Sequence, residues 1–346
     1  MKFFLLIVTL LVSRSIFSQE NGIKLLPPDQ GYIYHGAFPF MGKTEDIVTK
    51  ENIILFESLA GKDIAWVNFS NNWYNGIKFP SKEVELINSL GKIPYIRLMP
   101  RSNYNTFQKD TLYSIDNILK GRFDKQIRKW AQDAAAKNIP LMLDFGPEMN
   151  GNWFQWSGIH NGGSTKGPEN YVSAYRHIID IFRDEKAINI TWIFHPNNVS
   201  TPDEKWNSME AYYPGDDYID WIGMSVYGSQ RQGTFWYQFD DVMIRGYESL
   251  KKVSTKKPMA VLEFGVIEDP VKGNKAEWIV SALSSLISKR YPLIKAISYW
   301  QSEFQNTDGT ISDLKINSSE YSLRAYRNLI QSILFLDKVK MGKSEE

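Results

Sequence analysis

The chain has 346 residues, of which 43% are hydrophobic, 23% charged and 14% aromatic. This composition supplies a large buried core and excludes a disordered, collagen-like or coiled-coil protein. Forty Lys and Arg balance 39 Asp and Glu, so no overall field would gather nucleic acid or an anionic membrane.

Residue types that are rare or abundant narrow the chemistry further. Cys is absent, which excludes disulfides, cysteine–zinc sites and thiol nucleophiles, and four His make a histidine-rich metal centre unexpected. By contrast, the chain has 11 Trp, 18 Tyr and 19 Phe, more than a core of this size needs. Aromatic surfaces of this kind often stack on the apolar faces of sugars.

The first residues have the pattern of an export signal. Lys2 supplies a positive charge, Phe3–Val12 is an apolar run, and small polar residues follow as far as Ser18. The pattern predicts a secretory signal peptide over residues 1–18, and a run this short does not predict a membrane anchor. We therefore expect an exported protein, periplasmic or extracellular, and the lack of Cys favours a bacterial source.

Beyond the signal, short apolar runs alternate with longer amphipathic segments. The amphipathic segments have apolar residues spaced by three and four, as in helices, at 123–136, 170–183, 241–252 and 276–289. The eight apolar runs are 31–38, 63–68, 93–99, 140–145, 188–195, 219–226, 259–263 and 294–300.

Eight strand–helix repeats predict a (β/α)8 barrel. The runs are apolar on both faces, as in a parallel sheet covered by helices. A doubly wound open sheet is the alternative, but no Gly-x-Gly-x-x-Gly turn follows the first strand. With no repeat or linker to divide the chain, we expect one domain over residues 25–335, and a charged, flexible tail over 336–346.

Catalytic groups of such barrels lie at the carboxyl ends of the strands. Glu148 follows the fourth predicted strand and Glu263 ends the seventh, with Trp and Tyr residues nearby. Two carboxyl groups about 5–5.5 Å apart are what retaining glycoside cleavage requires: one protonates the leaving oxygen and the other attacks the anomeric carbon. Simpler interpretations are a surface glutamate capping a turn at Glu148, and at Glu263 a salt bridge to Arg97 or Arg101.

Three motifs along the chain resemble glycoside hydrolase family 26, a family of secreted (β/α)8 barrels that are mostly β-mannanases, with some mixed-linkage glucanases and β-1,3-xylanases. They are Glu-Met-Asn-Gly-x-Trp from Glu148, Tyr-Pro-Gly-Asp-Asp-Tyr-Ile-Asp-Trp-Ile-Gly over 213–223, and Glu-Phe-Gly from Glu263. The resemblance implies that Glu148 is the acid/base and Glu263 the nucleophile. It further implies that Trp153 lines the site, Tyr227 hydrogen-bonds the nucleophile, and Trp300 forms the floor beneath the sugar.

Further aromatic and polar residues are candidates for contact with substrate. We expect Arg97 to orient a carboxylate, and His195 either reaches the cleft or is a hydrogen-bonded structural residue. Trp73 belongs either to an outer subsite or to the core, and Trp156 has the same two alternatives. Tyr227, if it hydrogen-bonds Glu263, should keep that carboxyl ionised.

One position departs from the family pattern. Mannanases of this family usually carry His immediately before the acid/base glutamate, where it contacts the sugar; here the residue is Pro147, which has no N–H to donate. The sequence therefore predicts a secreted endo-acting retaining β-glycosidase that needs no metal or cofactor. β-1,4-mannan or glucomannan is the first expected substrate. The alternatives are a mixed-linkage β-glucanase, a β-1,3-xylanase, or a non-catalytic polysaccharide-binding barrel.

Overall fold

A computed structural model describes residues 22–39, 42, 44–306 and 308–343. The signal peptide predicted over residues 1–18 lies outside the described residues. None of the helices that the structure describes is both long and apolar enough to cross a membrane.

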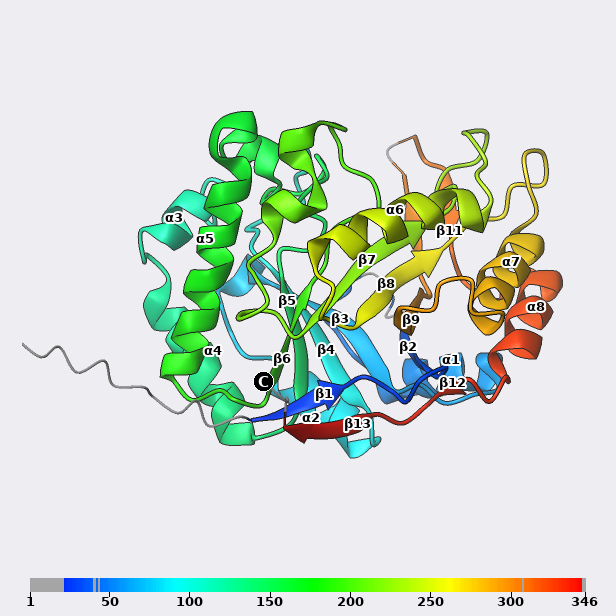
Figure 1. The fold of residues 1–346 in the computed structure, drawn as a ribbon, viewed down its shortest axis with the longest axis horizontal. Helices are drawn as coiled ribbons and strands as arrows, with labels where there is room; N and C mark the ends of the chain where they lie inside the picture. Colours follow the sequence, from blue (N-terminus) through cyan, green and yellow to red (C-terminus); the bar gives the residue numbers. More distant parts are fainter. Residues whose placement is uncertain (1–21, 40–41, 43, 307, 344–346) are drawn as a thin grey trace, which may run out of the picture.

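Within the described residues, eight parallel strands close into a barrel, because the first strand pairs with both the second and the last (Figure 1). The (β/α)8 prediction is confirmed. The barrel strands are β2 (Ile33–Phe38), β3 (Trp66–Asn72), β4 (Ile93–Met99), β5 (Leu141–Phe145), β6 (Ile190–Phe194), β7 (Trp221–Tyr227), β8 (Met259–Gly265) and β9 (Ile294–Trp300).

Helices surround the barrel, and some of them begin and end with capping signals in the sequence. α1 begins after Thr49, whose side chain caps its first turn, and ends at Gly61 in the left-handed conformation. The helices are α1 (Lys50–Ala60), α2 (Ser81–Ser89), α3 (Ile115–Leu119), α4 (Asp124–Lys137), α5 (Gly163–Asp184), α6 (Phe239–Val253), α7 (Lys275–Ile287) and α8 (Glu320–Ile330). Short 3₁₀ turns lie at Trp73–Asn75, Gly158–His160, Lys205–Asn207 and Met209–Tyr212.

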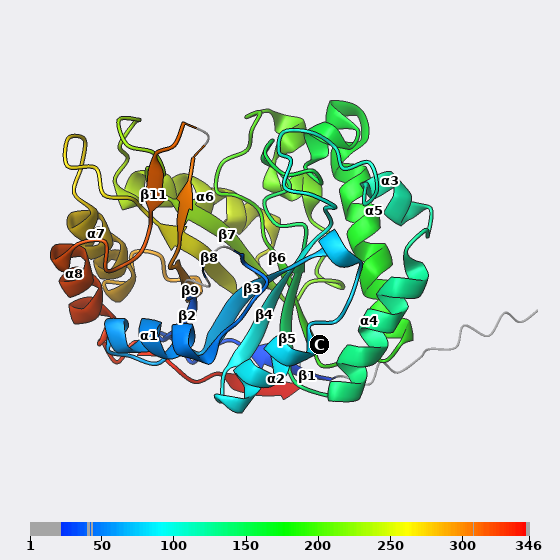
Figure 2. The same cartoon turned by 180° about the vertical axis from the view of Figure 1, so that it is seen from behind.

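Two small two-stranded sheets lie at opposite ends of the barrel (Figures 1 and 2). The hairpin of β10 (Glu303–Gln305) and β11 (Ile311–Asp313) follows the last barrel strand at its carboxyl end. At the other end, β1 (Ile23–Leu26) pairs antiparallel with β13 (Lys340–Lys343), and β12 (Phe335–Leu336) pairs with β2.

Residues 340–343, within the tail that was expected to be flexible, form a strand. These residues are paired along their whole length with β1. Leu25 of β1 is buried against the barrel interior. The backbone N–H of Leu25 donates to Thr191 Oγ1 (2.9 Å), and Trp221 Nε1 donates to the Leu25 carbonyl (2.8 Å). β1 and β13 therefore close the bottom of the barrel together. The charged composition of the β13 segment did not indicate a strand, because the strand is held by backbone pairing.

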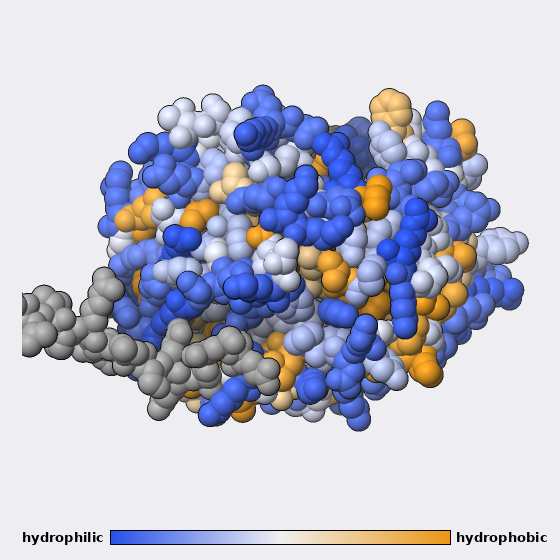
Figure 3. Space-filling model, viewed as in Figure 1, coloured by the Kyte–Doolittle hydropathy of each residue, from blue (hydrophilic) through white to orange (hydrophobic). Residues whose placement is uncertain are grey.

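The core has two parts. A large cluster fills the layer between strands and helices, and a smaller one, with members from every barrel strand, fills the barrel interior. Hydrophilic residues cover most of the face shown in Figure 3, where apolar residues are scattered.

Candidate active site

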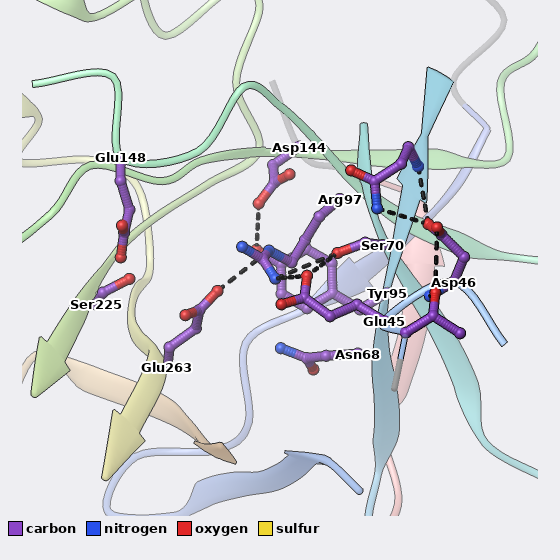
Figure 4. Close-up of polar contacts among 12 residues, drawn as sticks. Glu45, Asp46, Asn68, Ser70, Tyr95, Arg97, Asp144, Glu148, Ser225 and Glu263 are labelled. Carbon is purple, nitrogen blue, oxygen red and sulfur yellow. Dashed lines mark hydrogen bonds and ion pairs between the residues drawn. The ribbon is translucent and has the colours of Figure 1, made fainter. Parts of the chain in front are cut away.

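The upper interior of the barrel is polar because parallel register brings polar residues of neighbouring strands to one level. Ser70 on β3 lies opposite Arg97 on β4, and Arg97 lies opposite Asp144 on β5. Side chains that alternate along a strand point to one face, so all three point into the barrel near its carboxyl end. Figure 4 shows these side chains grouped with Glu263 around the Arg97 guanidinium.

A β-bulge aims Glu263 into this group. The register of β8 with β9 shifts between Val261 and Phe264, and the preceding residue, Leu262, already packs in the barrel interior. Strict alternation would turn Glu263 outward, since successive side chains in a strand face opposite sides. The bulge breaks the alternation, and both residues face inward.

Glu263 is a buried carboxyl with two partners. Their effect on its pKa is opposite to that of burial. Its side chain is 4% exposed, Arg97 Nε lies 3.1 Å from Oε1, and the Tyr227 hydroxyl donates to Oε2 at 2.7 Å. Burial raises the pKa of Glu263 to about 7, although Arg97 and the Tyr227 hydrogen bond act to lower it. The charge of Glu148 raises it further. Desolvation therefore sets the direction of the shift, whereas the Tyr227 hydrogen bond acts in the predicted direction, toward the ionised form.

Arg97 holds the centre of the site. Burial lowers its pKa, but the carboxylates of Glu263 and Glu45 raise it above the ordinary value for arginine. Its Nη1 lies 3.2 Å from Glu45 Oε2, and Ser70 Oγ donates to the same carboxylate at 2.6 Å. Arg97 is therefore a permanent cation shared between two carboxyl groups, and it fixes the orientation of Glu263.

Glu148 lies in a strained turn directly after β5. Its backbone φ is 57°, in the left-handed region that disfavours side chains, and Gly146 just before has φ 54°. The turn is held by the Glu148 N–H, which donates to the His195 carbonyl at 2.7 Å, and by Trp156 Nε1, which donates to the Pro147 carbonyl at 2.7 Å. Strain of this kind persists where the surroundings impose it, often at functional sites.

The residues after Glu148 explain the Glu-Met-Asn-Gly-x-Trp motif. Asn150 bridges to the end of β6 by donating to the Asn197 carbonyl (2.9 Å) and accepting from the Asn197 N–H (2.8 Å). Gly151 makes room for Trp153, because a Cβ there would lie 2.5 Å from the indole ring. Trp153 Nε1 then donates to Glu148 Oε2 at 2.7 Å. The Glu-Met-Asn-Gly-x-Trp motif thus fixes the orientation of the Glu148 carboxyl.

A buried polar chain supports both glutamates from below. The Tyr95 hydroxyl donates to Asp144 Oδ2 at 2.7 Å, and His195 Nδ1 lies 2.8 Å from the same oxygen. Nε2 of that imidazole is 3.0 Å from Ser225 Oγ. The electrostatic interaction with His195 acts to lower the pKa of Glu263. His195 therefore acts here as a hydrogen-bonded structural residue, one of its two predicted alternatives.

The arrangement brings two carboxyl groups with different surroundings near each other at the rim of the barrel. Glu148 and Glu263 extend from β5 and β8 toward the same space, with Ser225 between them in the view of Figure 4. Among residues 22–39, 42, 44–306 and 308–343, no group of three His, Asp or Glu side chains is placed to hold a metal ion. The chemistry that these residues offer is proton transfer and nucleophilic attack by carboxylates.

Comparison with known proteins agrees with this geometry. The family model of Glycosyl hydrolase family 26 matches residues 105–270, which span the loops of both glutamates. The chain belongs to glycosyl hydrolase family 26.

Relatives of this family 26 chain include an endoglucanase and mannan endo-1,4-beta-mannosidases. Endoglucanase H of Acetivibrio thermocellus is 30% identical over 330 residues, which cover 94% of this chain and 32% of that protein. A mannan endo-1,4-beta-mannosidase of Bacillus subtilis is 26% identical over 232 residues, 62% of this chain and 57% of that protein. The chain thus spans about a third of the first relative and little more than half of the second.

Solved structures share the fold of the family 26 chain. The catalytic domain of an endo-beta-1,4-mannanase from a Bacillus species superposes with a TM-score of 0.65 at 17% identity, covering 88% of this chain and 87% of that one. A beta-mannanase from Bacteroides ovatus gives 0.63 at 17% identity, covering 88% and 90%. At this identity the likeness concerns the barrel alone.

Two tryptophans predicted near substrate lie instead in the core. Trp73 and Trp156 are each 1% exposed. Trp73 packs edge-on against Tyr113, and Trp156 stacks on Phe154 with ring centroids 4.5 Å apart. A buried ring has no face to offer a sugar, so the structure favours the core, one of the two predicted alternatives, for both residues. Strand-end position suggested a cleft residue, but both rings pack among the buried residues of the large core cluster.

Trp300 reaches the site but is largely covered. It ends β9 opposite Phe38 on β2, and the two rings stack with centroids 4.0 Å apart. The Arg97 guanidinium lies 4.7 Å from the indole centroid, and the side chain is 6% exposed. Trp300 therefore offers little free surface to a sugar in this structure.

Sequence reasoning missed Glu45, which follows the first barrel strand and shares Arg97 with Glu263. No motif marks it. A weaker signal was available in the second strand, where Asn68, Ser70 and Asn72 place polar groups on one face of an otherwise apolar run. That spacing of two indicates a polar inner face at the rim, and hence partners such as Glu45.

Proposed function

We propose that this family 26 chain is an endo-acting, retaining β-glycosidase in which Glu263 is the nucleophile and Glu148 the acid/base. The observation that carries the proposal is the different environment of the two carboxyls among the described residues: Glu263 is held by Arg97 and Tyr227, and Glu148 accepts from Trp153. A nucleophile needs a fixed orientation and stabilised negative charge, and an acid/base must exchange a proton with substrate and water.

The proposed reaction has two steps. Ionised Glu263 attacks C1 of the bound sugar while Glu148 gives its proton to the leaving oxygen, and a glycosyl-enzyme forms. Glu148, now ionised, takes a proton from water, which attacks C1 and releases the sugar with its original anomeric configuration. Tyr227 is suited to its part because burial and the neighbouring carboxylates raise its pKa well above the ordinary value, so it stays a donor.

β-1,4-Mannan or glucomannan is the first proposed substrate, in keeping with relatives named as mannan endo-1,4-beta-mannosidases. A β-glucan is the second candidate. Pro147 replaces the usual histidine of mannanases, and the relative that matches 94% of this chain is named an endoglucanase. The release of reducing ends from mannan, glucomannan, mixed-linkage β-glucan and β-1,3-xylan distinguishes these substrates. A chain that binds one of them and cleaves none would be a polysaccharide-binding barrel.

The roles of the two glutamates are tested by Glu148→Ala. With an aryl glycoside, whose leaving group departs without protonation, the first step should survive, and a burst should precede slow turnover. Azide should restore turnover by attacking C1 directly. On polysaccharide the rate should fall about 10²–10⁴-fold, the usual contribution of acid–base assistance. Glu303→Ala, at a rim glutamate paired with Lys315, is the control and should keep its activity. Equal loss on both substrates without azide rescue would contradict the assignment.

We also propose that the enzyme acts outside the cytoplasm, on the evidence of Lys2 and the apolar run Phe3–Val12. Fractionation of cells expressing the whole chain, with N-terminal sequencing of the exported protein, tests this. We expect a new terminus near Gln19. An unprocessed chain that stays in the cytoplasm would contradict the proposal.

A further inference from the structure

The rim loop that joins β4 to α3 presents two aromatic rings to solvent. Tyr104 and Phe107 are each 64% exposed, in a loop where Asp110 is buried and closes the turn by accepting from the Ser102 N–H (2.7 Å) and hydroxyl (2.8 Å). Exposed rings grouped on one loop can form a binding surface, which the position of this loop then has to support.

This loop is joined to the loop that carries Glu148. The Phe107 N–H donates to the carbonyl of Trp153 at 3.1 Å, directly beside the indole that hydrogen-bonds Glu148. Gln155, which is 1% exposed, donates to the Asn103 carbonyl at 3.1 Å. The exposed rings are therefore continuous with the wall of the proposed cleft.

A buried arginine holds the Tyr104 ring from behind. The Arg101 guanidinium lies 5.4 Å from the Tyr104 centroid and 5.5 Å from that of Tyr74, and the two rings are 4.4 Å apart. Arg101 is 7% exposed, and its Nε donates to Asn72 Oδ1 at 2.5 Å. Cation–π contacts of this kind fix the ring without using its outward face.

Phe107 is in a conformation that its residue type disfavours. Its φ is 58°, in the left-handed region where Gly or Asn is ordinarily found. Its ring is mostly exposed, so little packing offsets this strain. Neither the backbone conformation at residue 107 nor packing in the core therefore explains why the residue is phenylalanine.

We propose that Tyr104 and Phe107 form a distal sugar-binding surface for the same β-glycan, which runs from the cleft over the Glu148 loop. The inference rests on the proposed function. The ligand should be neutral, because Arg101 is buried beneath the rings and the nearby Lys109 is paired with Asp116. Flat apolar rings match the C–H faces of sugars, and two rings beside the cleft would engage a chain too long for the cleavage subsites alone.

The test compares long and short substrates in the double variant Tyr104→Ala/Phe107→Ala. We expect kcat/KM on glucomannan or mixed-linkage β-glucan to fall about 10-fold, the scale of one lost aromatic contact. The value for an aryl glycoside should stay within about twofold, and a hexasaccharide should be cut at different bonds. Tyr321→Ala, at a tyrosine 78% exposed on α8, is the matched control and should change none of these.

Phe107→Gly separates binding from folding. Glycine accepts a φ of 58° without strain, so the melting temperature should be unchanged or higher while activity on long glycans falls. An equal loss on long and short substrates would overturn the inference, because the loop would then only support Glu148. Unchanged kinetics on both would overturn it as well.

A binding assay keeps the inference distinct from the proposed function. In the Glu263→Gln background, retardation in native gels that contain glucomannan or mixed-linkage β-glucan should be lost with the double variant. If the wild-type chain cleaves no glycan but the rings are needed for retardation, the proposed function fails and the binding surface stands. Retardation that does not depend on the rings would overturn the surface alone. Equal retardation of the chain in gels that contain an unrelated protein in place of the glycan would also overturn the proposed surface.

Discussion

The upper and lower halves of the barrel interior are built from the same eight strands but have opposite chemistry. The lower half is apolar and aromatic, with Trp66 and Trp221 fully buried and β1 closing it from below. The upper half holds Arg97, Glu263 and other polar groups at nearly the same degree of burial. The difference shows that burial by itself does not make an interior apolar. Charges are kept at the upper end, where each has a partner, although desolvating them is costly.

The comparison predicts that the two halves respond oppositely to mutation: changes in the upper half remove activity, and changes in the lower half remove stability. The largest effect should follow Glu263→Gln, which removes the proposed nucleophile while keeping its shape. Turnover should fall by about 10⁴-fold or more, the scale seen when a covalent enzyme loses its nucleophile. Steady-state kinetics on polysaccharide and aryl glycoside measure this, and both substrates should be affected alike. Substantial residual activity would place the nucleophile elsewhere.

Trp66→Ala tests the lower half. The Trp66 ring fills the space left by Gly36, where a Cβ would lie 2.1 Å from the indole nitrogen, and packs edge-on against Tyr34. The resulting cavity should cost about 3–5 kcal/mol of unfolding free energy, measured by denaturant titration. The folded variant should keep its activity. Phe235→Ala, at a ring 81% exposed, is the control and should change stability by about 0.5 kcal/mol or less.

The pH dependence of stability sharpens the comparison, because it isolates the cost of one buried charge. The pKa of Glu263 is about 7 in the folded chain against 4.5 for an ordinary glutamate. As pH rises from 4.5 to 7 the unfolded chain releases this proton first, so the folded state loses stability. The loss should reach about 3 kcal/mol above pH 7.

Glu263→Gln does not titrate and should escape that loss. The melting temperatures of the variant and the wild type should be similar near pH 4, and the variant should be the more stable at pH 8. Thermal unfolding across this range measures the difference. A constant difference at all pH values would mean that the carboxyl is not buried as its contacts indicate.

The smallest expected effect is that of Tyr227→Phe. This variant removes the hydroxyl that lowers the pKa of Glu263, so the acidic limb of the kcat/KM profile should move to higher pH. The rate near neutral pH should fall about 10–100-fold, as for one charge-assisted hydrogen bond. Tyr237→Phe, at an exposed rim tyrosine, is the control. A profile that keeps its position would show that Tyr227 contributes packing alone.

The sequence by itself determined the alternation of strands and helices, and through it the barrel. Hydrophobic periodicity and capping residues are local properties, and eight repeats leave few ways to close a sheet. The sequence also indicated Glu148 and Glu263, because charged residues at the ends of apolar strands need a reason and motifs flank both.

Only the tertiary structure decided how these carboxyls are held and which aromatic rings meet solvent. The bulge that turns Glu263 inward, the Glu45–Arg97 pair and the burial of Trp73 and Trp156 all depend on loops far apart in the sequence. The pairing of β1 with β13 likewise joins residues from the two ends of the chain. Local patterns encode which face of a strand is apolar, but exposure and pKa depend on the three-dimensional neighbours of a group, which no local pattern specifies.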